Sequence, residues 1–122
     1  GGGSAPNSDR RKSGWLIMQS ITVHELLEWR NTEAAHALID IREPYERDVS
    51  HIGGVHIPME QILDRLEEIP NDIPVVIHCR SGVRSAAVTH ALTNQYGRLN
   101  VHNLEGGIRA WAKHVDPNLE VA

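Results

Sequence analysis

The residue best suited to chemistry in this 122-residue sequence is Cys79, the chain's single cysteine. It follows the apolar run Val75-Val-Ile-His78 and begins the stretch Cys79-Arg-Ser-Gly-Val-Arg-Ser85. A thiol in a tight turn between a strand and a helix faces free backbone N–H groups and the positive end of the helix dipole. Both features favour the thiolate, which is a nucleophile. The sequence therefore predicts a reactive cysteine.

The residues that follow Cys79 suit the same chemistry. Arg80 and Arg84 add positive charge, and their guanidinium groups could hold an anionic substrate through paired hydrogen bonds. For Arg84, support of the loop is an equally open role. Gly82 lets the backbone curl close to the sulfur, whereas Val83 is expected to contribute only its backbone amide. The hydroxyl groups that could donate further hydrogen bonds belong to Ser81 and Ser85.

A plainer interpretation of Cys79 stays open on these grounds. A lone cysteine after an apolar strand is often a small buried hydrophobic side chain with no reactive role. The position at a helix start and the two flanking arginines favour reactivity over that interpretation. A single thiol also excludes an intrachain disulfide, a dithiol redox pair and a multi-cysteine zinc site within the chain.

The histidines add no catalytic or metal-binding pattern. His78 precedes the cysteine, but adjacent strand residues point to opposite faces, so a proton-transfer contact with the thiol is not expected. His51 and His56 lie in a predicted loop with no matching ligand pair elsewhere, and we therefore expect no metal site. No cofactor is expected either.

Strand-like and helix-like segments alternate from Gln19 onward. Thr22 and Glu25 form a capping box that predicts a helix to about Arg30. On two further helices the predicted apolar stripes are Met59, Ile62, Leu63 and Leu66 within residues 59–69, and Val83, Ala87 and Ala91, with Val88 and Leu92 beside them, on a helix ending near Gln95. The predicted strands are residues 37–41, 75–77 and 99–104, and the final helix carries Ile108, Trp111 and Ala112.

This alternation predicts an α/β fold in three layers, with a parallel sheet between helices. Ligands of such sheets bind outside the carboxyl ends of the strands. Asp40 and Arg42 reach that edge after the strand at 37–41, and we expect them to cap and tie down loops there. Glu105-Gly-Gly107 reaches the same edge after the strand at 99–104.

The length allows one domain, and the 40% hydrophobic and 23% charged residues are ordinary for a globular chain. Residues 1–17 are predicted to be a flexible linker or tag, and residues 18–122 the domain. The linker carries +2 and the domain −6 of the total net charge of −4. An acidic domain without an apolar span or a signal sequence predicts a cytoplasmic protein that binds neither nucleic acid nor membrane.

Four stretches, in order, resemble the rhodanese-like sulfurtransferase family. The resemblance covers about residues 19 to 115 and is carried by Leu38-Ile-Asp-Ile-Arg-Glu-Pro-Tyr-Glu46, His51-Ile-Gly-Gly-Val-His-Ile-Pro58, Cys79-Arg-Ser-Gly-Val-Arg84 and Leu104-Glu-Gly-Gly-Ile-Arg-Ala-Trp111. It implies a five-stranded parallel sheet flanked by helices, with Asp40 and Arg42 near the site. It also implies that Cys79 carries a sulfane sulfur as a persulfide, taken from a thiosulfate-like donor and passed to cyanide, a thiol or a sulfur-carrier protein.

The length of the loop favours sulfur over phosphate. Four residues separate Cys79 from Arg84, whereas related cysteine phosphatases and arsenate reductases have one residue more and enclose a tetrahedral oxyanion. Two other functions stay open: such a phosphatase or reductase, and a non-catalytic rhodanese-like docking module. Residues 106–119 are also similar to the rhodanese domains fused to molybdopterin-synthase-activating adenylyltransferases, so the chain could be a stand-alone protein or one domain of a larger one.

Overall fold

The computed structural model describes residues 11–12 and 15–122. Of the predicted linker, residues 1–10 and 13–14 lie outside the described residues. In its described part, β1 (Arg11–Lys12) and β2 (Trp15–Leu16) pair antiparallel. The Leu16 N–H donates to Oδ1 of Asn94 at 2.5 Å, and the Asn94 side-chain amide donates back to the Leu16 carbonyl. Contacts with the domain therefore begin before the predicted boundary at residue 18, because the Leu16 backbone finds partners there.

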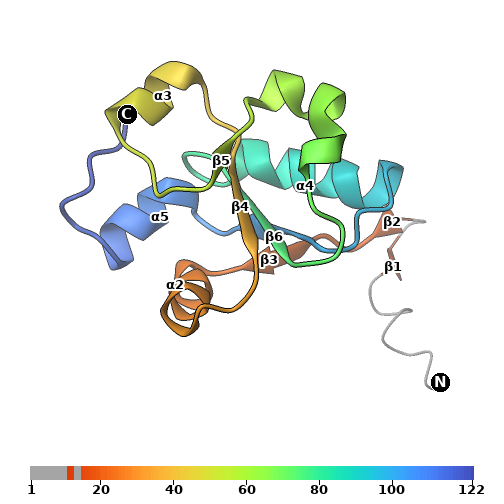
Figure 1. Ribbon diagram of the computed structural model, residues 1–122, viewed down its shortest axis with the longest axis horizontal. Helices are drawn as coiled ribbons and strands as arrows, with labels where there is room; N and C mark the ends of the chain where they lie inside the picture. Colours follow the sequence, from red (N-terminus) through yellow and green to blue (C-terminus); the bar gives the residue numbers. More distant parts are fainter. Residues whose placement is uncertain (1–10, 13–14) are drawn as a thin grey trace.

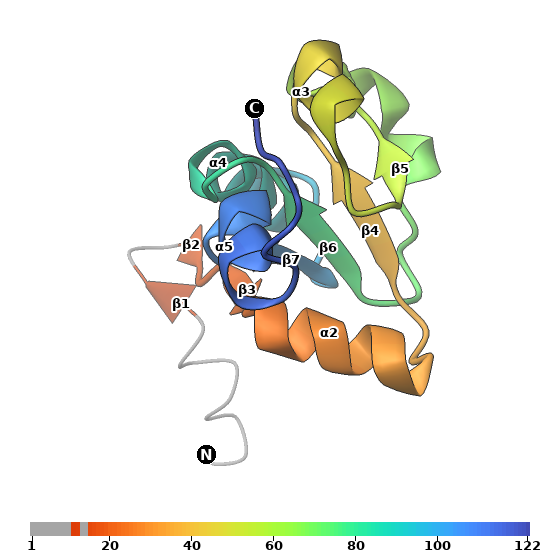
Figure 2. The ribbon, with the colours of Figure 1, turned by 90° about the vertical axis from the view of Figure 1, so that its left-hand side faces the viewer.

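A five-stranded parallel sheet forms the middle layer, which confirms the predicted architecture. Its order is β3-β7-β6-β4-β5, and Figure 2 shows the strands side by side in this order. Every residue of the central strand β6 is buried. The strands are β3 (Gln19–Ile21), β4 (Ala37–Asp40), β5 (Val55–His56), β6 (Val75–His78) and β7 (Val101–Leu104).

Helices cover both faces of the sheet and give the three predicted layers (Figure 1). On one face α2 (Val23–Thr32) and α5 (Gly107–His114) bury Leu26, Ile108 and Trp111 against the sheet. On the other face the 3₁₀ helix η2 (Met59–Glu68) and α4 (Val83–Gln95) bury Ile62, Val88 and Leu92. Among the described residues, no helix is long and apolar enough to cross a membrane.

The first helix follows the expected capping box. Oγ1 of Thr22 accepts the Glu25 N–H at 3.1 Å, and the Glu25 carboxylate accepts the Thr22 N–H at 2.9 Å. The helix runs to Thr32, slightly past the predicted end near Arg30, and closes at Glu33 in the left-handed conformation. Local capping therefore set where α2 starts, as the sequence indicates.

Several short elements were not predicted from the sequence patterns, among them one helix and one edge strand. The helix α3 (Pro44–Val49) begins with a proline, and the Glu43 N–H donates to the Glu46 carboxylate at 2.9 Å. The strand β5 has only two residues and pairs with the edge of β4. Elements this short leave no apolar periodicity in the sequence, and the surrounding fold holds them in place.

The segment at residues 59–69 differs from the predicted α-helix. It is a 3₁₀ helix interrupted at Arg65, where φ is −127°. A 3₁₀ helix has three residues per turn rather than 3.6, so an apolar stripe at α-helical spacing does not stay on one face. Ile62 is buried as expected, but Met59 and Leu63 remain 39% and 55% exposed.

On α4 the predicted stripe of Val83, Ala87 and Ala91 is not the buried face, although Val88 and Leu92 beside it are buried. Val83 is 74% exposed and Ala87 is exposed, whereas Val88 and Leu92 are buried. The polar residues that share the buried face are Ser85, Thr89 and Thr93. Small polar residues fit this face because it packs closely on β6 and β7. Apolar periodicity alone therefore misplaced the buried face of this helix.

The start of α5 contacts the loop that contains Cys79. The Ile108 N–H donates to the Cys79 carbonyl at 2.9 Å, and the Arg109 N–H donates to the Arg80 carbonyl at 3.0 Å. Gly107 lies at φ +61°, and a Cβ there would be 2.5 Å from the Cys79 oxygen and 2.6 Å from the Arg80 oxygen. Only glycine allows this approach.

Replacing Gly107 tests this contact. Gly107→Ala is expected to lower the free energy of unfolding by about 3 kcal/mol, because a left-handed conformation and a steric clash both cost energy. Gly97 is the matched control: its φ is +65°, and no described atom would lie within 4 Å of its Cβ. Gly97→Ala should cost only about 1 kcal/mol in urea unfolding. Equal losses for the two variants would contradict the close approach.

Candidate functional site

The loop between β6 and α4 folds around the sulfur of Cys79, which is 1% exposed. Sγ accepts the Gly82 N–H at 3.1 Å and lies 3.4 Å from the Ser85 N–H. Gly82 makes this possible, since it caps α4 at φ +98° in a conformation that other residues rarely adopt. The expectation that backbone amides at a helix start face this thiol is confirmed.

These contacts lower the pKa of the Cys79 thiol. Burial is the largest single influence and raises the pKa, because it disfavours the charged form. Hydrogen bonds from the Ser85 hydroxyl and from the amides of Ser85, Gly82 and Ser81 outweigh burial, and the pKa falls below its ordinary value. The amides and Ser85 thus favour the thiolate, with less need of the arginine charges than the sequence indicated.

A buried polar chain continues from Ser85 to β7. The Ser85 hydroxyl lies 3.4 Å from Sγ of Cys79 and 2.5 Å from Oδ1 of Asn103. A hydroxyl has one proton to donate, so the direction of these hydrogen bonds depends on the state of Cys79. The thiol donates to the Ser85 hydroxyl, which donates to Oδ1 of Asn103. When the thiolate forms and Asn103 presents its amide nitrogen instead, Asn103 donates to Ser85 and Ser85 donates to the sulfur. Sequence reasoning missed Asn103; the signal was a polar residue within a predicted strand, although His102 beside it is polar too.

Arg84 is bound to a carboxylate that was also missed. Its guanidinium donates two hydrogen bonds to Glu46 of α3, at 2.8 and 2.9 Å. These bonds from Arg84 lower the pKa of Glu46, despite its burial, and Glu46 raises the pKa of Arg84. The pair ties the active loop to α3. It also balances much of the positive charge that the sequence had assigned to this position.

The other loop residues point in different directions. Arg80 donates from Nε to the carbonyl of Ala122 at 2.6 Å, so its guanidinium lies on the C-terminal segment. Ser81 is exposed, and the Val83 side chain points into solvent. Binding of an anionic donor by Arg80 stays a prediction, and it would require the guanidinium to leave the Ala122 carbonyl.

Asp40 and Arg42 form a buried ion pair at the carboxyl edge of the sheet. Arg42 donates to the Asp40 carboxylate from Nε at 3.0 Å and from Nη2 at 2.9 Å, and also to the Ser50 carbonyl. Burial alone would raise the pKa of Asp40, but the Arg42 hydrogen bonds and the neighbouring charges lower it to about 2. The pair holds the chain after β4 against the segment that follows α3.

His78 lies beside this pair and stays uncharged. Its Cα is the register partner of Asp40, and its side chain is fully buried. Within the described part of the chain, neither ring nitrogen has a hydrogen-bond partner. Burial lowers the pKa of His78 to about 4, although the Asp40 charge opposes this. Among the described residues no hydrogen bond joins this ring to the Cys79 sulfur, in line with the expected strand geometry.

The site holds a nucleophile and an anion cradle but no metal cluster among the described residues, where no three histidine, cysteine or acidic side chains gather. A buried sulfur surrounded by amide donors can stabilise a negative charge on itself or on an atom attached to it. The geometry therefore suits attack by Cys79 followed by storage of a small anionic group.

Sequence comparison gives an independent result. A family model described as the rhodanese-like domain matches residues 22–114. The probable adenylyltransferase/sulfurtransferase MoeZ of Mycobacterium tuberculosis is 36% identical over 103 residues, which cover 82% of this chain and 26% of that protein. A protein named sulfurtransferase from Allochromatium vinosum is 48% identical over 79 residues, covering 63% of this chain and 72% of that protein.

Solved structures show the same fold. The rhodanese-like domain protein of Staphylococcus aureus superimposes with a TM-score of 0.72 at 32% identity, covering 86% of this chain and 99% of that one. The chain spans about a quarter of the length of the adenylyltransferase/sulfurtransferase relative. Similarity to that protein therefore concerns one of its parts.

The role of the Ser85 hydroxyl can be measured at the thiol itself. Ser85→Ala removes one hydrogen bond to a developing charge and is expected to raise the pKa of Cys79 by about one unit. Ser85→Thr keeps a hydroxyl and is the matched control. The chain has one cysteine, so the pH dependence of its alkylation rate reports this pKa directly. An unchanged pKa in Ser85→Ala would contradict the role of the hydroxyl.

His78 should make folding sensitive to mild acid. Its pKa is about 4 when folded and near 6.5 when unfolded, so below pH 6.5 the unfolded chain binds a proton that the folded chain does not. Stability should fall between pH 6.5 and 4, by about 3 kcal/mol.

His78→Asn should lose this part of the pH dependence in urea unfolding, even if its stability at neutral pH is lower. The exposed His24 is the control, and His24→Asn should keep the wild-type slope. The same slope in His78→Asn would show that the burial of His78 does not control it.

Proposed function

Because this chain belongs to the rhodanese-like sulfurtransferase family, we propose that it transfers a sulfane sulfur from a thiosulfate-like donor to a thiophilic acceptor through a persulfide on Cys79. The observation that carries the proposal is the buried Sγ, which accepts the N–H of Gly82 and lies beside the N–H and hydroxyl of Ser85. This arrangement supports one small anionic atom attached to the cysteine.

The first half of the reaction loads the sulfur. The Cys79 thiolate attacks the outer sulfur of thiosulfate, a new S–S bond forms, and the bond inside thiosulfate breaks. Sulfite leaves with the bonding electron pair, and the persulfide keeps one negative charge. The loop amides would stabilise that charge on the outer sulfur, as donors do in an oxyanion hole.

The second half of the reaction transfers this sulfur to an acceptor. An acceptor with a free electron pair, such as cyanide or a thiolate, attacks the outer sulfur of the persulfide. The bond to Cys79 breaks, and its electron pair returns to the cysteine as a thiolate. With one cysteine in the chain, no second thiol of the same chain can resolve the persulfide, so the acceptor must come from outside it.

Each loop residue has a proposed part. Gly82, Ser81 and Val83 supply backbone amides and the tight turn around the sulfur, and Arg80 and Arg84 attract an anionic donor. The contact between Arg84 and Glu46 supports a second role for Arg84, which is to hold the loop in shape. Asp40 and Arg42 would act as positioning residues at the sheet edge, since they bind each other and the backbone.

The acceptor proposed for the cell is a protein or a thiol rather than cyanide. Relatives of the chain are named adenylyltransferase and sulfurtransferase, and sulfur-carrier proteins are acceptors for fused domains of that kind. A thiol acceptor fits a reducing compartment such as the cytoplasm, in which free cysteines persist.

Intact mass measurement tests the proposal. After incubation with thiosulfate, the protein should gain the mass of one sulfur atom, and cyanide should remove it with formation of thiocyanate. Cys79→Ser should gain no mass, because it lacks the attacking thiolate. The same measurement with 3-mercaptopyruvate compares a second donor class.

Two outcomes would overturn this function. Absence of a sulfur adduct with both donors in the wild-type protein would favour the non-catalytic docking module. Turnover of a phosphate ester well above turnover of thiosulfate would favour a cysteine phosphatase, despite the short loop between Cys79 and Arg84.

A further inference from the structure

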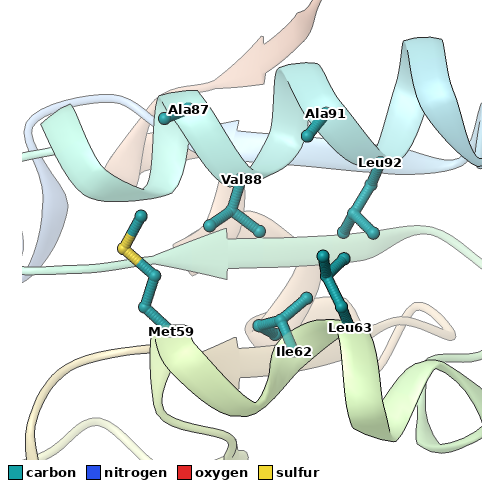
Figure 3. A pocket seen from close by; sticks show the side chains of 7 residues that line it. All are labelled: Met59, Ile62, Leu63, Ala87, Val88, Ala91 and Leu92. Carbon is teal, nitrogen blue, oxygen red and sulfur yellow. The ribbon is translucent and has the colours of Figure 1, made fainter.

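An apolar groove lies between η2 and α4, beside the active loop. Figure 3 shows Met59, Ile62 and Leu63 of η2 opposite Val88 and Leu92 of α4, with Ala87 and Ala91 on the same helix. We call these seven residues the η2–α4 groove. Its volume is about 190 Å³. A cavity of about 150 Å³ accommodates benzene, so the groove has room for one aliphatic or aromatic side chain of a partner.

The groove consists of side chains that the sequence pattern assigned to the core. Met59, Leu63 and Ala87 belong to apolar stripes, yet all three are exposed. The 3₁₀ geometry of η2 and the orientation of α4 leave these stripes facing each other across the gap. Apolar side chains gathered in a hollow are typical of an interaction site rather than of a solvated surface.

The groove continues toward the active loop. Met59 and Leu63 also line an adjoining hollow whose other residues include Arg84. Arg84 is the last residue of the loop motif, and its guanidinium is bound to Glu46. A partner seated in the groove would therefore lie next to the loop that surrounds Cys79.

The adjoining hollow carries a negative charge. Its acidic rim consists of Glu43, Glu60 and Asp64. Within the described part of the chain, none of these three carboxylates has an ion-pair partner. The single cation, Arg84, is neutralised by Glu46. Such a rim attracts a cationic partner, by about 1 kcal/mol per charge in water and less at high salt.

From the apolar groove and its acidic rim we propose that this face docks a protein acceptor of the sulfur. The docking segment of the acceptor would place one aliphatic side chain between Met59 and Ala87 and lysine or arginine side chains against Glu60 and Asp64. The partner's thiolate would then attack the outer sulfur of the persulfide, which restores the Cys79 thiolate. The inference rests on the proposed function, because it names the kind of acceptor that this site serves.

Synthetic peptides test the inference. The probe has one leucine between lysines and ends in a cysteine; one matched peptide has glutamates for the lysines, and another has serine for the leucine. The probe should remove sulfur from loaded protein with a KM about tenfold below that of either matched peptide. Added salt should raise the KM of the probe and leave cyanide kinetics with little change.

Variants of the groove have matched controls elsewhere. Leu63→Ser and Glu60→Lys should each raise the KM of the probe about tenfold and leave transfer to cyanide unchanged. Leu99→Ser and Glu67→Lys should change neither the KM of the probe nor transfer to cyanide. Leu99 matches Leu63 because the two side chains are 50% and 55% exposed, and Glu67 matches Glu60 because both are exposed acids of η2.

Binding is measured separately from chemistry. A probe ending in serine, added to the full chain, should shift the backbone amide NMR signals of Ala87 and Ala91. If these signals shift but the protein transfers no sulfur to cyanide, the docking face is supported and the proposed function is overturned. Transfer to cyanide with equal KM for all peptides, or with amide shifts confined to other faces, would overturn the docking face alone.

Discussion

The loop around Cys79 must favour the thiolate form of a sulfur that is almost fully buried. Burial opposes ionisation of Cys79, and amide N–H groups and the Ser85 hydroxyl outweigh that opposition. They can do so only if the loop after β6 closes tightly around the sulfur. Gly82 in the left-handed conformation closes it from the α4 side. Gly107 allows the first turn of α5 to bind the loop carbonyls from the other side.

Other interactions fix this loop from further away. Arg84 reaches Glu46 on α3, and Arg80 reaches the carbonyl of Ala122. The end of the chain lies near α3 (Figure 1), where the Ser50 hydroxyl donates to the Glu120 carbonyl. Segments far apart in the sequence thus converge on one loop. The charges of Arg80 and Arg84 suggest ligand binding, but both side chains also bind other parts of the protein and hold the loop in place.

The helices on the two faces of the sheet differ in how completely they bury their apolar side chains. The side covered by α2 and α5 forms a closed core around Leu26, Ile108 and Trp111. The side covered by η2 and α4 is incompletely filled, because η2 is a 3₁₀ helix and leaves Met59 and Leu63 exposed. The same departure from helical periodicity that made the sequence prediction fail also creates the groove beside the active loop.

Local patterns in the sequence were enough to predict the layered α/β fold, the N-cap of α2 at Thr22 and the position of Cys79 in a turn before α4. Those features depend on local capping, on apolar runs and on glycine in a short motif, all of which are encoded within a few residues. The side chains that surround the sulfur and the apolar stripes that are buried depend instead on contacts between distant elements. Asn103 and Glu46 come from distant elements, and the orientation of α4 depends on close packing against β6 and β7. Contacts of that kind leave no periodic trace in the order of residues, because they are made by folding across long separations in the chain.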